Sequence, residues 1–266
     1  MQGFNDIAGI YDQTFTHTRI GKAQRNIVWR YLLRDLPDPP ASILEMNGGT
    51  GTDALFLLQQ GYTVTATDGA ANMVSEIKKK IAGQTNGKAL VWDLHGPLPL
   101  GDAKYAVGFS NFGGWNCLHT EALQQLGLQL RDHLPENGKL IVVVMGRKCL
   151  WERFYFLWKG DKHNRKRRRS KNAVPANTGS GLLPVYYYAP KELAACLHPY
   201  FTVRTIRPVG ICIPPSYMEK GMKKIPLLLS LCIVLEKFFG LFPFLSNQAD
   251  HYYMLLEKNK SEAHIR

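Results

Sequence analysis

The sequence predicts an α/β fold in which a mostly parallel sheet carries helices on both faces. The first observation is the stretch 43–60, where an apolar run enters a glycine-rich turn and then a helical pattern. That order is typical of a buried parallel strand followed by a helix. The second is that strand and helix patterns alternate up to residue 145, as crossover connections require. The third is the apolar, largely β-branched run 139–145, which suits a strand buried on both faces.

Length and composition favour a single domain with a sizeable core. The chain has 266 residues, of which 45% are hydrophobic. Its five cysteines are scattered without a C-x-x-C pair, which predicts reduced thiols and no metal site. The N-terminus shows no basic segment followed by an apolar run, and no apolar run reaches the ~20 residues of a membrane span. These features predict a cytoplasmic protein.

The positive charge is concentrated in one segment. The net charge is +12, and residues 159–171 contain eight basic residues and one acidic residue, which is +7 and leaves +5 for the rest. The charge is therefore a local property more than a field over the whole fold. A run of cations without regular apolar spacing is expected to be solvated and mobile.

The remaining elements follow from the same patterns. Residues 1–36 contain two helical pieces, and the prolines within 37–40 end them because proline cannot continue a helix. Residues 173–181 are polar and contain glycine, which predicts a mobile loop. The expected strands are 42–46, 63–67, 88–92, 105–110, 139–145, 201–208 and 251–257, and the other expected helices are 54–60, one that starts at 69, 123–134 and 190–197.

The glycine turn at residues 47–51 is the first candidate site. Glycine permits unusual backbone angles and lets a ligand approach the chain closely, and the free N–H groups of the following helix can bind a polar or anionic ligand. Gly49, Gly51 and Ala54 fit the dinucleotide fingerprint G-x-G-x-x-G/A, which indicates an NAD(P)-dependent oxidoreductase. Asn47 stands where a longer pattern would have its first glycine, and asparagine tolerates left-handed geometry.

Acidic residues after the next two strands separate two interpretations of this turn. Asp68 ends the second expected strand, where a carboxylate can accept both ribose hydroxyls of an adenosine, and Met73 follows five residues later. Asp93 ends the third strand, where a dinucleotide site requires no carboxylate. With Glu45 ahead of the glycines, this series of motifs resembles class I methyltransferases that use S-adenosylmethionine (AdoMet).

The resemblance covers roughly residues 4–146 and carries four motifs in the expected order. It implies a Rossmann-like seven-stranded sheet of order 3-2-1-4-5-7-6 with strand 7 antiparallel, and it implies that Asp93 meets the adenine amino group. Residues 4–12 resemble the N-terminal helix of ubiquinone/menaquinone-type methyltransferases, where a Tyr-Asp pair lies over the cofactor. Residues 111–119 resemble the motif that lines the methyl-donor end. The expected AdoMet contacts are Tyr11, Glu45, Asn47, Gly48, Gly49, Gly51, Asp68, Gly69, Met73, Asp93, Leu94, Asn111 and Phe112.

The acceptor is expected to be a small molecule. The sequence lacks the N-P-P-Y/F tetrad typical of DNA-adenine and glutamine N-methyltransferases. A hydroxyl acceptor would need a base, whereas an amine or carbanion needs none. The expected acceptor-pocket residues are Trp115, Asn116, Arg147 and Tyr217. The candidate bases are His17, His119 and His251, and Tyr11 and Tyr217 are candidates for groups that orient the base.

Two insertions complete the predicted organisation of the single domain 1–266. The first carries an aromatic face and the basic run, and the second is apolar and flanked by lysines. Such segments fit a pocket for a hydrophobic acceptor or the surface of an anionic membrane, or they simply pack on the sheet. The expected parts are a helical lid (1–36), an AdoMet-binding core (37–146), a basic mobile insert (147–183) and a C-terminal half (184–266) with a cap insert (214–247).

The sequence therefore predicts an enzyme that transfers a methyl group from AdoMet to a small, hydrophobic or amphiphilic acceptor. Oxygen, nitrogen and carbon all stay open as the methylated atom, and the oligomeric state stays open too. The alternatives are an NAD(P)-dependent oxidoreductase that uses the same glycine turn, and an RNA-binding or RNA-modifying protein that acts through residues 159–171.

Overall fold

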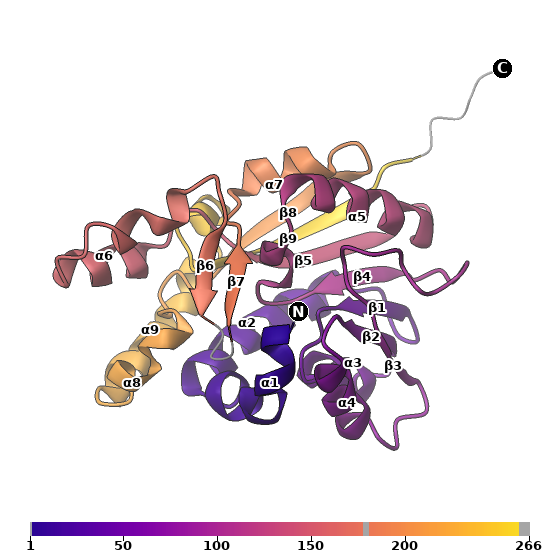
Figure 1. Ribbon diagram of the computed structural model, residues 1–266, viewed down its shortest axis with the longest axis horizontal. Coiled ribbons are helices and arrows are strands. Elements are labelled where there is room, and N and C mark those ends of the chain that lie inside the picture. Colours follow the sequence, from indigo (N-terminus) through magenta and orange to yellow (C-terminus); the bar gives the residue numbers. More distant parts are fainter. Residues whose placement is uncertain (1, 178–180, 261–266) are drawn as a thin grey trace.

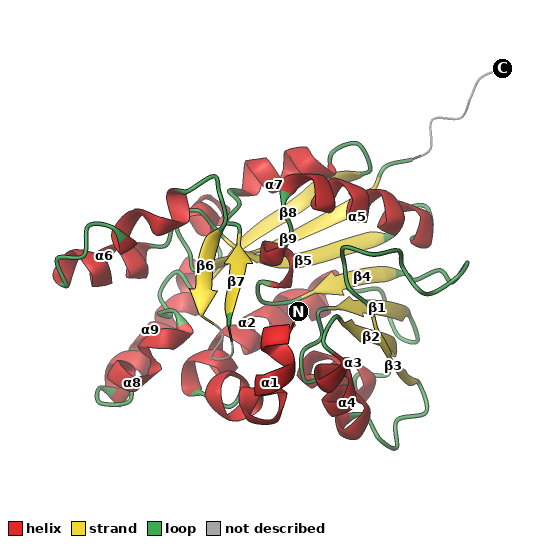
Figure 2. Cartoon of the chain, viewed as in Figure 1, coloured by secondary structure: helices red, strands yellow, loops and turns green. Residues whose placement is uncertain are grey.

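The computed structural model describes residues 2–177 and 181–260, and its centre is a seven-stranded sheet between two layers of helices (Figure 1, Figure 2). The strand order is β3-β2-β1-β4-β5-β9-β8, and β9 runs antiparallel to both of its neighbours. This confirms the predicted order, since β8 and β9 are the sixth and seventh strands of the sheet. The strands are β1 (Ser42–Met46), β2 (Thr63–Asp68), β3 (Gly87–Val91), β4 (Val107–Ser110), β5 (Lys139–Met145), β8 (Phe201–Val209) and β9 (His251–Lys258).

The side chains of β5 show how the core is divided between the two faces of the sheet. Ile141 and Val143 pack with the helices of one face, whereas Leu140, Val142 and Val144 pack with those of the other. Full burial of each such side chain stabilises the fold by about 1.5–3 kcal/mol. The first face is covered by α2 (Arg19–Asp35), α3 (Thr52–Gln59) and α4 (Ala71–Lys80), and the second by α5 (Thr120–His133) and α7 (Pro190–Leu197).

The N-terminal segment crosses the carboxyl ends of the first strands. It consists of α1 (Gln2–Tyr11), a π-helical turn (Asp12–Thr16) and α2, so the two expected helical pieces are present. The side chain of Asn5 accepts a bond from the backbone N–H of Asn72 (3.0 Å), and its carbonyl accepts one from the Asn72 amide (3.0 Å). Helix α1 is therefore tied to the start of α4, beside the glycine turn.

The first insert is more ordered than its sequence predicts. It forms α6 (Leu150–Trp158), the 3-10 helix η3 (Asn164–Arg169) and a separate hairpin of β6 (Val174–Asn177) and β7 (Leu182–Val185). The loop predicted over 173–181 is thus wrong for residues 174–177, which pair with β7, and residues 178–180 lie outside the described residues.

Two arginines of the basic run are ion-paired rather than solvated. Arg167 donates to both oxygens of Glu152 (2.8 and 3.0 Å), and Arg168 donates to Glu152 (2.9 Å) and to Asp250 (2.7 Å). The Arg168 side chain is buried, and so are both carboxylates. Burial acts to raise the pKa of Asp250, but the charges of His251 and Arg168 hold it below its usual range. The prediction of a solvated run is wrong for these two residues, and Arg168 fastens the insert to Asp250, the residue before β9.

The second insert packs beside the sheet. It contains α8 (Glu219–Met222) and α9 (Pro226–Phe239), flanked by the 3-10 turns η4 (Ser216–Met218) and η5 (Pro243–Asn247). The buried carboxylate of Glu236 accepts hydrogen bonds from four consecutive backbone N–H groups of residues 210–213, at 2.6–3.2 Å. Since those N–H groups have no strand partner, Glu236 fixes α9 against the end of β8.

Replacing Glu236 should destabilise the fold strongly. In Glu236→Ala, four backbone N–H groups lose their acceptor, and we expect the free energy of unfolding to fall by about 3 kcal/mol or more. Urea denaturation followed by circular dichroism measures the change. Lys237→Ala is the matched control, because the next side chain on the same helix is exposed. Equal midpoints for the two variants would contradict this role of the carboxylate.

Candidate active site

The glycine turn between β1 and α3 has the left-handed backbone that its sequence predicts. Asn47 (φ 55°), Gly49 (φ 57°) and Gly51 (φ 80°) all lie in the left-handed region. Gly51 cannot be replaced without strain, since a Cβ there would lie 3.0 Å from the Cα of Ile77 on α4. The turn is therefore held tightly between the sheet and α4, and the N–H groups of Gly48 and Gly51 are bonded to backbone carbonyls (2.8 and 2.9 Å).

A buried ion pair lies beneath the turn. Arg25 of α2 pairs with Asp53 in the first turn of α3. Asp53 also accepts a bond from the indole N–H of Trp29 (2.6 Å) and one from the side-chain amide of Asn111 (2.9 Å). One carboxylate thus joins α2, α3 and the residue that follows β4. These contacts fix the relative positions of the elements whose ends form the site.

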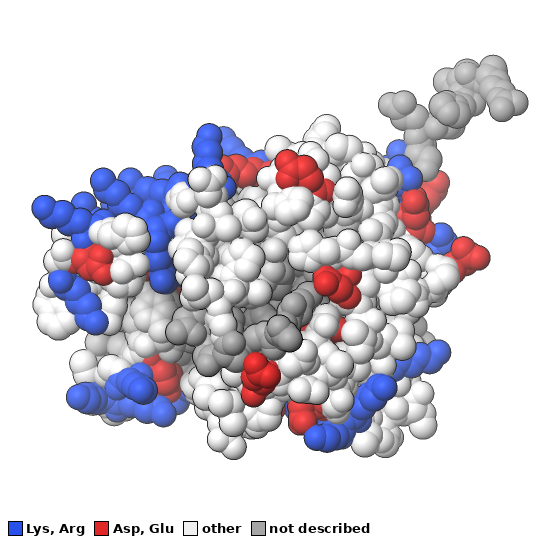
Figure 3. All heavy atoms as spheres, in the orientation of Figure 1, with Lys and Arg blue, Asp and Glu red and all other residues white. Residues whose placement is uncertain are grey.

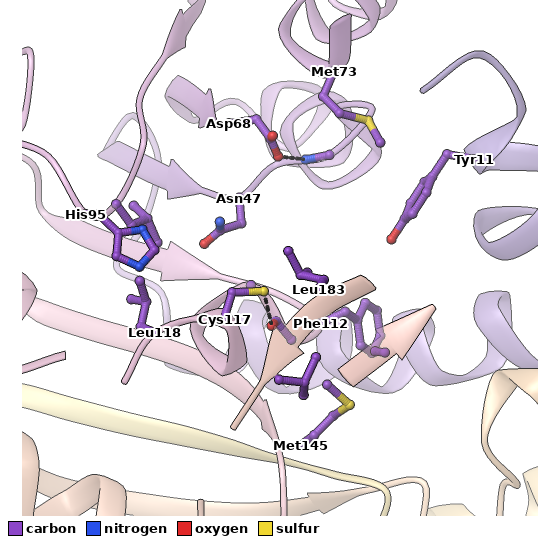
Figure 4. Close-up of a pocket in the computed structure, with 16 residues that line it drawn as sticks. Tyr11, Asn47, Asp68, Met73, His95, Phe112, Cys117, Leu118, Met145 and Leu183 are labelled. Atoms are coloured by element: carbon purple, nitrogen blue, oxygen red, sulfur yellow. Dashed lines mark hydrogen bonds between the residues drawn. The ribbon is translucent and has the colours of Figure 1, made fainter. Parts of the chain in front are cut away.

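Asp68 lies across from the turn, at the end of β2. One oxygen accepts a bond from the N–H of Gly49 (3.0 Å) and the other accepts one from the N–H of Ala70 (2.9 Å). Figure 4 shows the carboxylate at the edge of the cavity, on the same side as Met73. Burial raises the pKa of Asp68 to about 6. A carboxylate in this position can accept further hydrogen bonds from hydroxyl groups of a ligand.

The turn opens into a cavity of about 240 Å³. Tyr11 and Met73 reach it from one side, and Phe112, Met145 and Leu183 close the other (Figure 4). The cavity is polar beside the turn and mainly apolar away from it. The polar side chains of the lining are Tyr11, Asn47, Asp68 and His95, and the other lining residues are Gly49, Met73, Leu94, Phe112, Gly113, Gly114, Cys117, Leu118, Met145, Ala176, Leu183 and Val185.

The hairpin β6–β7 supplies one wall of this cavity. Leu183 and Val185 line the cavity, whereas Leu182, the first residue of β7, is 73% exposed, as the alternation of side chains along a strand requires. Asn116 anchors the base of the hairpin: its amide donates to the carbonyls of Tyr186 (2.6 Å) and Met145 (3.1 Å). The second insert contributes no side chain to the cavity within the described residues, and the predicted role of 214–247 as a cap stays a prediction.

The four residues predicted for the acceptor pocket lie elsewhere. Trp115 is buried in the core, and Asn116 is used in the anchor described above. Arg147 pairs with Glu192, and the ring of Tyr217 packs on that of Tyr155 (5.9 Å). None of the four lines the cavity.

Most residues predicted for the cofactor do surround the turn. Tyr11, Asn47, Gly49, Asp68, Met73, Leu94 and Phe112 line the cavity, and Gly48 and Asn111 line a smaller polar hollow next to it, together with Arg25, Thr50, Thr52 and Asp53.

The other predicted cofactor residues act from behind the cavity or beside it. Glu45 is buried under the turn, with Oε2 3.2 Å from the place of a Cβ on Gly48, and burial raises its pKa well above the usual range. Gly51 packs on α4, and Gly69 follows Asp68 without lining the cavity. Asp93 turns to the ring of His95 (2.9 Å), so that Leu94 and His95 line the cavity instead. His95 was missed, although its place two residues after Asp93 was a usable signal.

None of the histidines suggested as bases lines the cavity. His17 is exposed, and His119 is exposed and caps α5 by accepting a bond from the N–H of Ala122 (3.3 Å). His251 is buried, and its ring packs edge-on against Phe112 (5.3 Å).

Two other titratable groups of the cavity remain protonated at neutral pH. Burial raises the pKa of the Tyr11 hydroxyl to about 12 and that of the Cys117 thiol to about 11. Of the described residues, no group of three or more His, Cys, Asp and Glu side chains could hold a metal ion. The site can therefore bind and orient a ligand, and it offers little for base catalysis at its apolar end.

Comparisons with known proteins agree with this fold and site. Residues 43–138 match the family model described as Methyltransferase domain. No curated protein matches the chain. Of the solved structures, the DhpI–SAH complex has a TM-score of 0.62 at 15% identity, covering 98% of this chain and 95% of that one. The CcbJ methyltransferase from Streptomyces caelestis has a TM-score of 0.61 at 15% identity, covering 97% and 98%.

The match runs from β1 to the residue before β5, and the strand order and the solved structures show that the chain has the same fold as the methyltransferases among them. The chain carries the methyltransferase domain in residues 43–138. Neither finding favours an oxidoreductase or an RNA-binding protein. The more specific likeness to ubiquinone/menaquinone-type enzymes is not confirmed and stays a prediction.

Lowering the pH should weaken cofactor binding through Asp68. Because its pKa is about 6, the group is mostly protonated in the free protein at about pH 5 and cannot accept hydroxyl hydrogen bonds on both oxygens. We expect the affinity for S-adenosylhomocysteine to fall roughly tenfold per pH unit below about 6. Isothermal titration at about pH 5 and about pH 7.5 measures this.

The same group makes an opposite contribution to folding. Since the folded-state pKa is raised, the native state holds this proton more tightly than the unfolded chain does. Its stabilising contribution is present at low pH and is lost as the pH rises through about 6. Asp68→Asn is the control for both effects and should show a flat profile for binding. An affinity of the wild type that does not change over this range would contradict the raised pKa.

Proposed function

We propose that this methyltransferase transfers the methyl group of AdoMet to a small hydrophobic or amphiphilic acceptor bound beneath the β6–β7 hairpin. The observation that carries the proposal is the division of the cavity. Its polar end adjoins the glycine turn, and Met145, Leu183 and Val185 line it away from the turn. An apolar wall binds an apolar acceptor favourably, because binding removes the apolar surface of the acceptor from water. A charged acceptor gains little from such a wall.

The polar end suits the cofactor. Asp68 can accept the ribose hydroxyls, and Leu94 and His95 lie where the adenine would extend. The smaller polar hollow holds Arg25, whose buried Nε has no hydrogen-bond partner among the described residues, and the hydroxyl of Thr50. That hollow suits the charged amino-acid end of AdoMet. The sulfonium would then lie where the cavity and the smaller polar hollow meet, near Asn47 and Phe112, which line both.

Transfer from a sulfonium requires positioning more than acid–base chemistry. The methyl group is already a strong electrophile, so the enzyme needs to hold the acceptor atom in line with the carbon–sulfur bond. The thiol of Cys117 and the hydroxyl of Tyr11 stay protonated at neutral pH, so each can donate a hydrogen bond to the molecule that receives the methyl group. This lining favours a nucleophile that needs no protein base, such as an amine or a stabilised carbanion.

The N-terminal residues 1–36 fit the role of a lid over the cofactor. Of the described part, Tyr11 reaches into the cavity from the end of α1, and α1 is tied to α4 through Asn5 and Asn72. Asp12 is bonded to the hydroxyl of Thr50 (2.5 Å) and to Lys80 (2.6 Å). This segment can therefore exclude water from the reacting centre while its polar contacts hold it closed.

Removing the Asp68 carboxylate tests the placement of the cofactor. Asp68→Ala should weaken binding of S-adenosylhomocysteine by about 1.5–3 kcal/mol, because charge-assisted hydrogen bonds to the ribose are lost. Isothermal titration measures the change, with Asp102→Ala, an exposed position, as the control. Wild-type affinity in Asp68→Ala would show that the ribose does not bind there.

Two variants of one strand test the acceptor class. The protein is incubated with methyl-labelled AdoMet and a cell extract, and the products are partitioned between an organic and an aqueous phase. Label should appear in the organic phase, and Leu183→Lys should reduce it at least about tenfold by placing a charge in the apolar end. Leu182→Lys, which alters the exposed neighbour, should leave it unchanged. Label found only in water-soluble small molecules, protein or RNA would overturn the proposal.

A further inference from the structure

Apolar side chains cluster on the outside of the two inserts. Helix α9 buries only Leu229, Cys232 and Glu236, and its other sides are open to solvent. Leu227 of α9 and Trp158 of α6 are each 83% exposed. The exposed apolar residues of α6 and of the second insert are Phe154, Leu157, Trp158, Tyr217, Ile225, Leu227, Leu228, Leu231, Val234, Leu235, Phe238, Phe239, Leu241 and Phe244, which we call the apolar face.

The two inserts, which both expose apolar side chains, are in contact with each other. The rings of Tyr155 and Tyr217 are 5.9 Å apart, and the indole of Trp151 donates to the carbonyl of Cys212 (2.9 Å). Figure 1 shows α6, α8 and α9 at the same end of the molecule, at its left. The apolar face is therefore contributed by both inserts at one end of the protein.

In these inserts most of the carboxylates are buried, whereas cations remain on the surface. Residues 148–171 and 214–247 contain four carboxylates, and three of them are buried. Glu152 pairs with arginines, whereas Glu219 and Glu236 accept bonds from backbone N–H groups. The remaining one, Asp161, bonds to Asn164 (2.6 Å). The solvent side of both inserts is consequently rich in cations and nearly free of acids.

A cleft between α6 and η3 joins the cationic and apolar groups. It has a volume of about 340 Å³. Arg153, Arg165, Lys166 and Arg169 line it, and none of them is ion-paired within the part of the chain that the structure describes. The same cleft is lined by Leu150, Phe154 and Leu157. Figure 3 shows lysines and arginines gathered over α6 and again near α8, on either side of uncharged surface.

We propose that this end of the molecule docks on an anionic phospholipid bilayer. The unpaired cations would meet lipid phosphates, and the apolar face would enter the boundary between headgroups and acyl chains. Nucleic acid fits less well, because its phosphate backbone would leave the apolar face of α9 in water. No described helix can cross a membrane, and α9, with 14 residues, is about 21 Å long against about 30 Å of hydrocarbon. Docking at the surface is independent of the proposed acceptor.

Sedimentation with vesicles tests the proposal. The full chain should pellet with vesicles of phosphatidylcholine and phosphatidylserine, weakly with phosphatidylcholine alone, and less at high salt. The triple variant Arg165→Gln, Lys166→Gln, Arg169→Gln should lower the partition coefficient on the order of 100-fold. The double variant Leu231→Ser, Val234→Ser should lower it at least about tenfold. Both sets of positions are on the surface, and circular dichroism with titration of S-adenosylhomocysteine checks that each variant folds.

Matched controls separate docking from a general effect of charge or hydrophobicity. Lys78→Gln, Lys79→Gln, Lys88→Gln removes the same charge from α4 and β3, and Leu33→Ser, Leu128→Ser alters exposed leucines of α2 and α5. Both controls should bind like the wild type. A wild type that stays in the supernatant with anionic vesicles, or controls that lose as much binding, would overturn the proposal. Binding to single-stranded RNA that only the cationic variant loses, without vesicle binding, would assign the surface to nucleic acid.

Discussion

The left-handed turn between β1 and α3 is the constraint on which the rest of the site depends. Its backbone is fixed from two directions, by Ile77 packed against Gly51 and by the Asp68 carboxylate bonded to the N–H of Gly49. The pair Arg25–Asp53 then holds α2 and α3 beneath it. Because the carboxyl ends of β1, β2 and β4 meet here, this one turn sets where a cofactor can lie relative to the cavity.

A second buried ionic cluster serves the other half of the cavity. Glu152, Arg168 and Asp250 link α6, η3 and the start of β9. Breaking a buried pair of this kind leaves an uncompensated charge, which is far more costly than the loss of a surface pair. The insert that forms the hairpin is thus attached to the sheet by charge, while the first half of the site is built on the sheet itself.

Elements and residues that depend on local sequence pattern could be predicted from the sequence. Side-chain contacts with partners far away in the chain could not. Strands β1 to β5, the turn, Asp68 and the left-handed Asn47 could be predicted because periodicity, glycine and strand ends are local signals. The inward turn of Arg168 could not be predicted, because its partner Asp250 lies 82 residues away. Asn116 was expected in the acceptor pocket for the same reason: an amide in the loop after a strand can face a ligand or bridge two backbone segments, and only the positions of Met145 and Tyr186 decide.

The hairpin β6–β7 forms a sheet of its own, and its strands pair only with each other among the described residues. Changes to its inward side chains therefore leave every hydrogen bond of the seven-stranded sheet in place. On the proposed placement of the acceptor, acceptor choice and cofactor binding would then depend on separate parts of one domain. A library that varies only Ala176, Leu183 and Val185 would explore new acceptors on an unchanged cofactor platform, which makes the hairpin the natural starting point for redesign.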